Sequence, residues 1–224
     1  MLREELQSYF DRAYPYSKID SEHPLKGQIH IRFELGGENK NGTIKRVNQA
    51  TDRAFTIFNE TFKESAHEIF VLIYEYQGAN ILNTSNDYLY KQFPKDEFVG
   101  FYSKFEIINA SYIAADENKN LFTEKREVRV VIGKLAIKNI DIKNILNGIA
   151  NLEMGFDPCI NQRIFFFDPI TDKAFQMYDD RGCYVWSNNA DNIRDIYIKR
   201  NDWIVESYRS KINEYFRNDN KNGI

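Results

Sequence analysis

The sequence predicts an α+β fold, with a mixed, antiparallel-rich sheet, helices packed mainly on one face of it, and a C-terminal helical segment. The first observation behind this is a strict alternation of apolar and polar residues over 28–35, typical of a half-buried strand. The second is the helical spacing of apolar residues over 44–62. The third is a set of three short strand patterns between residues 163 and 186, separated by turn residues. They favour local hairpins over the crossovers of a doubly wound α/β fold.

The N-terminal half is predicted to hold two helices and two strands. Residues 1–14 carry apolar residues at helical spacing, and Pro15 ends that helix. After the strand at 28–35, Thr43 is expected to cap the second helix. Residues 68–76 are almost continuously apolar, which indicates a central strand covered on both faces.

The C-terminal half is predicted to add a long strand at 125–137 and a helix at 140–152. The three-strand meander follows, and a last helical region covers 190–216, with a break expected at Asn201-Asp202. Residues 78–120 match neither period over most of their length, apart from a short helical pattern near 87–92.

Length and composition indicate one soluble globular domain over residues 1–224, with a frayed tail at 218–224. Hydrophobic residues make up 42% of the chain, and no stretch approaches the ~18 consecutive apolar residues of a membrane span. The first ten residues mix charged and apolar types, unlike a signal peptide, and only two cysteines occur. A cytoplasmic protein without a membrane partner is therefore expected.

The charge balance argues against a dedicated nucleic-acid-binding protein. The 30 basic and 33 acidic residues give a formal net charge of −3. Nucleic-acid-binding domains usually carry a basic patch and a pI above about 9. The three histidines and two cysteines lack metal-ligand spacing, so neither a metal nor a cofactor is expected.

Two pairs of segments resemble a known bacterial family. The first pair is Ile31-Arg32-Phe33-Glu34-Leu35 and residues 53–62. The second pair is Met177-Tyr178-Asp179-Asp180-Arg181-Gly182 and, about twenty residues later, Asp202-Trp203-Ile204. Over roughly residues 28–217 the chain resembles the family that contains domain of unknown function 3885. The resemblance implies a Tyr-Asp-Asp-Arg-Gly turn between two strands and implies no activity.

The Tyr178–Gly182 turn is the candidate functional site. Its two carboxylates are able to hold a divalent cation or accept protons, and Arg181 is able to clamp an anion. The same residues also suit a purely structural turn, with Gly182 in the left-handed position of a bulge. On that basis Gly182→Val is expected to cost more stability than Asp180→Ala.

Three further residues join this site. Arg32 and Glu34 share one face of the strand at 28–35 with His30, and they need partners if that face is covered. Trp203 comes from the second pair of family-like segments. The candidate binding cluster is Tyr178, Asp179, Asp180, Arg181, Gly182, Arg32, Glu34 and Trp203, and no catalytic residue is singled out. Among the other aromatic residues, a set that fits either the core or a recognition surface is Tyr102, Tyr112, Tyr184, Trp186 and Tyr208.

Two functions of different classes fit the sequence. The first is a non-enzymatic protein-interaction module of the immunity or antitoxin type, which binds and blocks another protein. It is favoured by the lack of a nucleophile or phosphate-loop motif and by an acidic charge that suits a basic partner. The alternative is a small-ligand-binding protein or enzyme that uses the Asp/Arg cluster at Tyr178–Gly182. It requires a pocket that joins this turn to Arg32 and Glu34.

Overall fold

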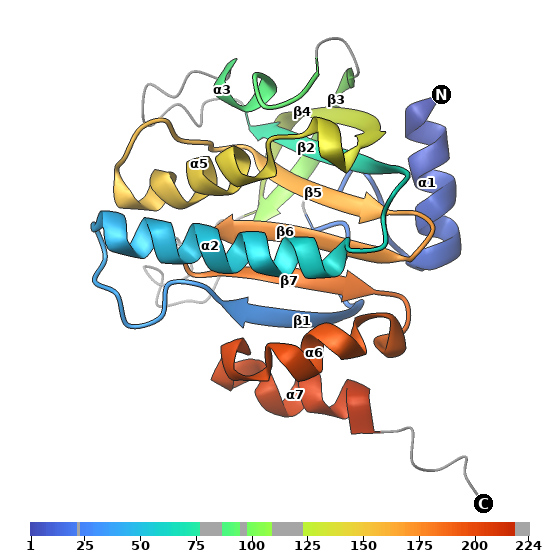
Figure 1. The fold of residues 1–224 in the computed structure, drawn as a ribbon. Coiled ribbons are helices and arrows are strands. Elements are labelled where there is room, and N and C mark those ends of the chain that lie inside the picture. Colours follow the sequence, from blue (N-terminus) through green and yellow to red (C-terminus); the bar gives the residue numbers. More distant parts are fainter. Residues whose placement is uncertain (22, 77–86, 95–97, 109–122, 218–224) are drawn as a thin grey trace, which may run out of the picture.

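A seven-stranded antiparallel sheet forms the centre of the computed structural model, which describes residues 1–21, 23–76, 87–94, 98–108 and 123–217 (Figure 1). The strands are β1 (Ile29–Glu34), β2 (Glu68–Tyr76), β3 (Phe98–Ile108), β4 (Thr123–Ala136), β5 (Arg163–Asp168), β6 (Lys173–Asp179) and β7 (Gly182–Ser187). Their order across the sheet is β1-β7-β6-β5-β2-β4-β3, and each paired neighbour is antiparallel. The predicted α+β fold is confirmed, and its antiparallel character is complete among the described strands.

Helices cover both faces of this sheet to different extents. The helices are α1 (Leu2–Ala13), α2 (Ile44–Thr61), α3 (Asp87–Tyr90), α5 (Ile142–Met154), α6 (Arg194–Lys199) and α7 (Glu206–Arg217), with short 3₁₀ turns η1 (Ile137–Asn139), η2 (Ala190–Ile193) and η3 (Asn201–Trp203). In Figure 1, α2 and α5 lie side by side across one face, and α6 and α7 lie beyond the β1 edge. The helical region predicted at 190–216 is therefore divided, with η3 at the break.

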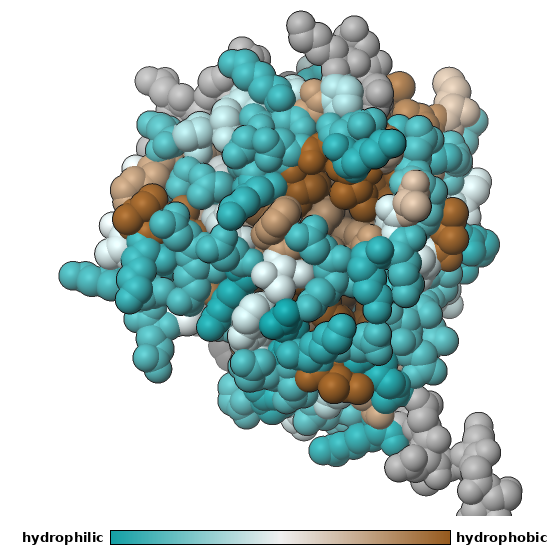
Figure 2. Space-filling model, in the orientation of Figure 1, coloured by the Kyte–Doolittle hydropathy of each residue, from teal (hydrophilic) through white to brown (hydrophobic). Residues whose placement is uncertain are grey.

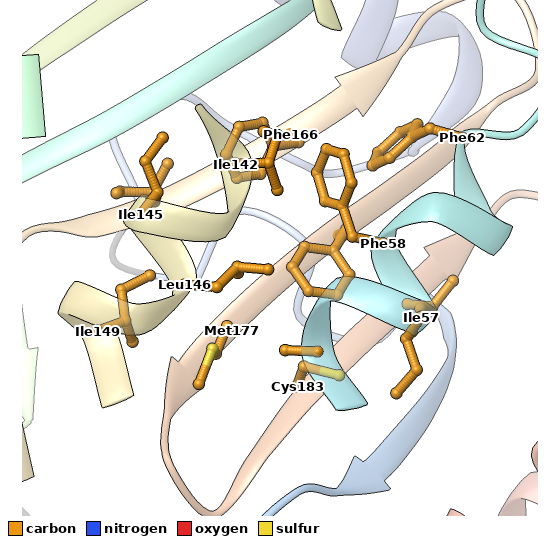
Figure 3. Close-up of a cluster of buried hydrophobic side chains, with 14 of the residues drawn as sticks. Ile57, Phe58, Phe62, Ile142, Ile145, Leu146, Ile149, Phe166, Met177 and Cys183 are labelled. Atoms are coloured by element: carbon orange, nitrogen blue, oxygen red, sulfur yellow. The ribbon is translucent and has the colours of Figure 1, made fainter. Parts of the chain in front are cut away.

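The α2 helix forms as its sequence pattern predicts. The Thr43 side chain accepts a hydrogen bond from the Arg46 amide and satisfies one of the free N–H groups of the first turn. Its buried stripe includes Ala54 and Phe58 and packs against α5 and the sheet (Figure 3). The Phe58 ring lies 5.1 Å from that of Phe166, and full burial of such a side chain stabilises the fold by about 2–3 kcal/mol.

Strand alternation divides the interior into two cores. On β1, Phe33 points into the core beneath α2 and α5, whereas the next residue back, Arg32, points to the opposite face. On β7, Val185 belongs to the helical face and Trp186 to the opposite one. Every second residue of these strands is thus available to build a site on the face away from α2.

That second face is only partly covered by α1. Phe10 of α1 packs at 5.0 Å from the ring of Phe167, and Tyr9 packs on Phe70, so α1 lies over β5 and β2. The segment after α1 is held down by the Tyr74 hydroxyl, which donates to the Ile19 carbonyl. The part of this face formed by β6, β7 and β1 is not covered by α1, and a cavity opens there.

The opposite, helical face is mostly hydrophilic. Figure 2 shows polar side chains over most of it, with apolar residues gathered above the C-terminal half of α2, beside α5. Within the described ranges, no helix is both long and apolar enough to cross a membrane.

Candidate ligand-binding site

A cavity of about 580 Å³ opens on the β6-β7-β1 part of the face away from α2. This volume lies within the range of small-molecule sites, roughly 300–1,000 Å³. The residues that line it are His23, Pro24, Leu25, Lys26, Gly27, His30, Arg32, Arg163, Phe165, Gln176, Tyr178, Tyr184 and Trp186.

Strand register brings the lining residues together. The pairing of β1 with β7 sets Arg32 opposite Tyr184 and His30 opposite Trp186. The pairing of β6 with β7 sets Gln176 opposite Tyr184 from the other side. The three side chains Arg32, Tyr184 and Gln176 therefore form one row across the sheet on the cavity side.

A β-bulge places Tyr178 in this site. Met177 pairs with Cys183 and Asp179 pairs with Gly182, so Tyr178 has no residue opposite it. A bulge re-aims the side chain it carries, and here the Tyr178 hydroxyl reaches β1. It accepts hydrogen bonds from Arg32 Nε at 3.1 Å and from Arg32 Nη2 at 2.7 Å.

Arg32 is a half-buried cation surrounded by rings. Its guanidinium carbon lies 4.6 Å from the ring centre of Tyr208, 5.3 Å from that of Tyr178 and 5.8 Å from that of Tyr184. Within the described ranges, no carboxylate pairs with it. Burial alone would lower the pKa of Arg32, but the Tyr178 hydrogen bond and the neighbouring phenols outweigh burial and raise it. Arg32 therefore stays charged.

Two of the tyrosines around Arg32, Tyr178 and Tyr184, stay neutral. Burial raises the pKa of Tyr178 to about 12, although the hydrogen bond from Arg32 opposes this. Burial also raises the pKa of Tyr184. Both phenols keep their protons at physiological pH, so neither neutralises the charge on Arg32.

The cavity is basic although the chain as a whole is acidic. Arg32 and Lys26 contribute cations, and none of its described lining residues is Asp or Glu. The guanidinium of Arg163 lies over the Tyr76 ring at 5.6 Å. Burial lowers the pKa of His30, which favours its neutral form at pH 7. A positive pocket in a protein of net charge −3 is a local feature and indicates an anionic ligand.

The carboxylates of the predicted turn serve the fold and do not line the cavity. Asp179 accepts from the Arg181 amide at 2.7 Å and from Arg181 Nε at 2.8 Å. Asp180 is buried and pairs with Arg46 of α2. Gly182 does not have the positive φ expected of it. A Cβ at this position would instead lie 2.7 Å from the Phe33 carbonyl oxygen.

The two remaining predicted residues, Glu34 and Trp203, do not line the cavity. Glu34 accepts from the Gly37 amide at 3.1 Å and does not pair with Arg32. The Trp203 ring lies between two arginines, 5.0 Å from Arg53 and 4.7 Å from Arg200. Of the eight predicted residues, the structure therefore brings Arg32 and Tyr178 together in the cavity.

Several lining residues were not assigned to the predicted cluster. Tyr184 and Trp186 appeared only in the aromatic set that fits core or surface, and Gln176 was not singled out. The signal available was their alternation with Cys183 and Val185, which assigns them to one face. The sequence predicted a bulge in this turn at Gly182, whereas the bulged residue is Tyr178. Of the other aromatic residues, Tyr102 is 60% exposed on β3, Tyr208 contacts Arg32, and Tyr112 lies outside the described residues.

A second buried polar group, Asp168 at the end of β5, serves stability. Its side chain accepts from the hydroxyl of Ser65, from the amides of Ile170 and Thr171, and it contacts His67 Nε2 at 2.7 Å. Burial alone would raise the pKa of Asp168, but these hydrogen bonds outweigh burial and lower it.

We expect Asp168→Asn to lower the free energy of unfolding at pH 7 by about 2–3 kcal/mol. Since the folded-state pKa is depressed, this stabilisation is present above the unfolded value of about 3.9 and is lost as pH falls through the folded value. Urea midpoints should therefore differ between the two proteins at pH 7 and converge below about pH 4. A constant gap down to pH 2 would contradict this, and Asp191→Asn, at an exposed position, is the control.

Most of the chain matches one family of proteins. A family model described as "Domain of unknown function (DUF3885)" matches residues 6–208. The match begins earlier than the resemblance expected from residue 28 and includes every strand. No curated protein and no solved structure matches the chain.

Proposed function

The chain belongs to the DUF3885 family, and we propose that it binds a small anionic ligand in the cavity that Arg32 and Tyr178 share. The observation that carries this proposal is the state of Arg32. It is a half-buried cation whose immediate neighbours are neutral tyrosines, in a cavity with no described acidic lining residue. An unbalanced cation in a partly desolvated site favours binding of an anion.

The geometry leaves Arg32 able to bind. Its Nε and Nη2 donate to a single acceptor, the Tyr178 hydroxyl, and its Nη1 donates to no described group. A guanidinium has five N–H donors in a rigid fork that matches phosphate and carboxylate oxygens. Tyr178 holds this fork in place and retains its own proton as a further donor to the ligand.

This proposal is a form of the small-ligand alternative raised by the sequence, with two residues of the predicted cluster, Arg32 and Tyr178, as its anchor. The carboxylates at Asp179 and Asp180 are engaged elsewhere, so Arg32 and Tyr178 take the functional role. A protein-interaction function of the immunity or antitoxin type stays a prediction.

The test compares two arginines in the intact protein. Arg32→Gln removes the proposed anchor, and Arg53→Gln removes a matched arginine that lies over a ring outside the cavity. Melting temperatures would be measured with inorganic phosphate, benzoate, ribose 5-phosphate and nucleoside monophosphates. A ligand at 100 times its Kd adds about 2.7 kcal/mol, which is roughly 5–10 °C for a chain of this size.

We expect at least one of these anions to stabilise the wild type and Arg53→Gln but not Arg32→Gln. Both unliganded variants should show the far-UV spectrum of the wild type, which separates lost binding from lost folding. An equal response of Arg32→Gln and wild type would overturn the proposal. An unchanged melting temperature of the wild type with every probe at about 10 mM would also overturn the proposal.

A further inference from the structure

The cavity has an aromatic wall in addition to its anion anchor. Four rings follow one another along it. The Tyr178 and Tyr184 centres are 5.4 Å apart, those of Tyr184 and Trp186 are 5.0 Å apart at 30°, and those of Trp186 and Phe165 are 6.1 Å apart. Phe165 and Trp186 are 2% and 7% exposed and also belong to the hydrophobic core on this face, whereas Tyr184 is only partly buried. The accessible ring of the wall is therefore mainly that of Tyr184, and anion binding by Arg32 does not require it.

Gln176 provides a second and independent feature. The residue is only 6% exposed, and its side chain lines the cavity and makes no hydrogen bond within the described part of the chain. Its amide atoms are not among the fully enclosed polar atoms that lack a partner, so they reach the cavity and are open to a ligand there. A ligand that offers one acceptor and one donor side by side would satisfy both groups.

We infer that the ligand is a mononucleotide, with its phosphate on Arg32, its base stacked on the Tyr184–Trp186 wall, and the polar edge of the base on Gln176. This inference rests on the proposed function. A planar heteroaromatic ring uses the π faces of the wall, and its edge carries the adjacent donor and acceptor that a glutamine amide reads. An aliphatic phosphate would leave both features unused.

The spacing of the two polar anchors suits this ligand. Arg32 and Gln176 flank Tyr184 on either side in the strand register. Two strand spacings of about 4.8 Å separate their backbones by roughly 10 Å. A mononucleotide extends over a comparable distance from phosphate to base edge. The cavity volume of about 580 Å³ also accommodates one nucleotide.

A single nucleotide is favoured over a strand of nucleic acid. The chain carries a net charge of −3, whereas proteins that hold extended single strands present a positively charged groove along the backbone. A short oligonucleotide is nevertheless one of the probes in the test.

The experiment measures calorimetric Kd values for AMP, GMP, CMP, UMP, ribose 5-phosphate and a pentanucleotide. We expect at least one nucleoside monophosphate to bind about ten- to a hundredfold more tightly than ribose 5-phosphate. Gln176→Met, of similar volume, should erase most of this preference, with a larger loss of affinity for the nucleotide than for ribose 5-phosphate. Tyr184→Leu supplies an independent second variant, and its result is also given as the ratio of the two affinities because the Tyr184 ring lies near Arg32. Trp203→Phe, at a position that does not line the cavity, should keep the wild-type preference.

Different results separate the inference from the proposed function. If ribose 5-phosphate binds as tightly as every nucleotide and Arg32→Gln weakens it, the anion site stands and the nucleotide inference is overturned. A nucleotide preference that both variants retain also overturns it. The inference is also overturned if the pentanucleotide binds more than about tenfold tighter than any mononucleotide, with a steep salt dependence. The aromatic wall would then bind a strand of nucleic acid. If no anion binds, both the nucleotide inference and the proposed function are overturned.

Discussion

Asp180→Ala is expected to lower the free energy of unfolding by about 3–5 kcal/mol, measured by urea denaturation at pH 7. Asp180 is 1% exposed, and its carboxylate pairs with Arg46, which is 8% exposed. The guanidinium of Arg46 also donates to the Asn39 carbonyl at 2.9 Å, so it is held inside the loop before α2. The variant keeps the charge on Arg46 and removes the carboxylate that balances it, which is why the cost is large.

Two further proteins control for this interpretation. Asp52→Ala breaks an exposed pair with Lys143 and should cost less than about 0.5 kcal/mol. The double variant Arg46→Met/Asp180→Leu removes both charges and should recover most of the stability lost in Asp180→Ala. Equal losses of unfolding free energy in Asp180→Ala and Asp52→Ala would show that breaking the buried pair is no more destabilising than breaking the exposed one.

The Arg46–Asp180 pair also shows where prediction from the sequence stops. Periodicity predicted the α2 stripe, and local hydrogen bonding predicted its Thr43 cap, since both depend on residues within a few positions. The partner of Asp180 lies 134 residues away in the chain. Which residue covers a turn depends on how α2 packs on the sheet, and no local pattern contains that information.

The same limit applies to the candidate site. The sequence placed Arg32 and Tyr178 in one candidate cluster but did not predict their hydrogen bond, which joins positions 146 residues apart. Alternation assigned Arg32 to one face of its strand, but only the pairing of β1 with β7 brings Tyr184 beside it. The bulge that turns Tyr178 toward β1 is a property of paired strands. The small-ligand alternative expected a pocket between the turn and Arg32, and two of its residues line the observed cavity, but other lining residues such as Gln176 were not predicted.

The family-like turn itself has a structural explanation that differs from the one expected. Gly182 was predicted to adopt a left-handed backbone, whereas the described glycines with positive φ are Gly27, Gly37, Gly42 and Gly155. Gly182 is required because β1 and the Tyr178 hydroxyl approach its α-carbon closely. The turn thus connects the fold to the cavity, since whatever displaces Tyr178 also releases Arg32.

Gly182→Val is expected to cost about 3 kcal/mol or more, because the new side chain would overpack two fixed neighbours. Its Cβ would lie 2.7 Å from the Phe33 carbonyl oxygen, a backbone atom of the paired strand that cannot move without disturbing the sheet. It would also meet the Tyr178 hydroxyl. The loss of unfolding free energy should be comparable to that of Asp180→Ala. The left-handed turn predicted from the sequence had implied a larger loss for Gly182→Val than for Asp180→Ala.

Gly42→Val distinguishes close approach from backbone strain. Gly42 has a φ of +73°, and no atom of the described residues lies within 4 Å of the point that a Cβ would occupy. Its substitution therefore costs only the left-handed strain, about 1–2 kcal/mol. Urea denaturation of both variants gives the comparison. Equal losses would mean that contact with β1 and Tyr178 adds nothing at Gly182. A larger loss at Gly182, together with weaker anion binding in the folded fraction, would tie this turn to the position of Arg32.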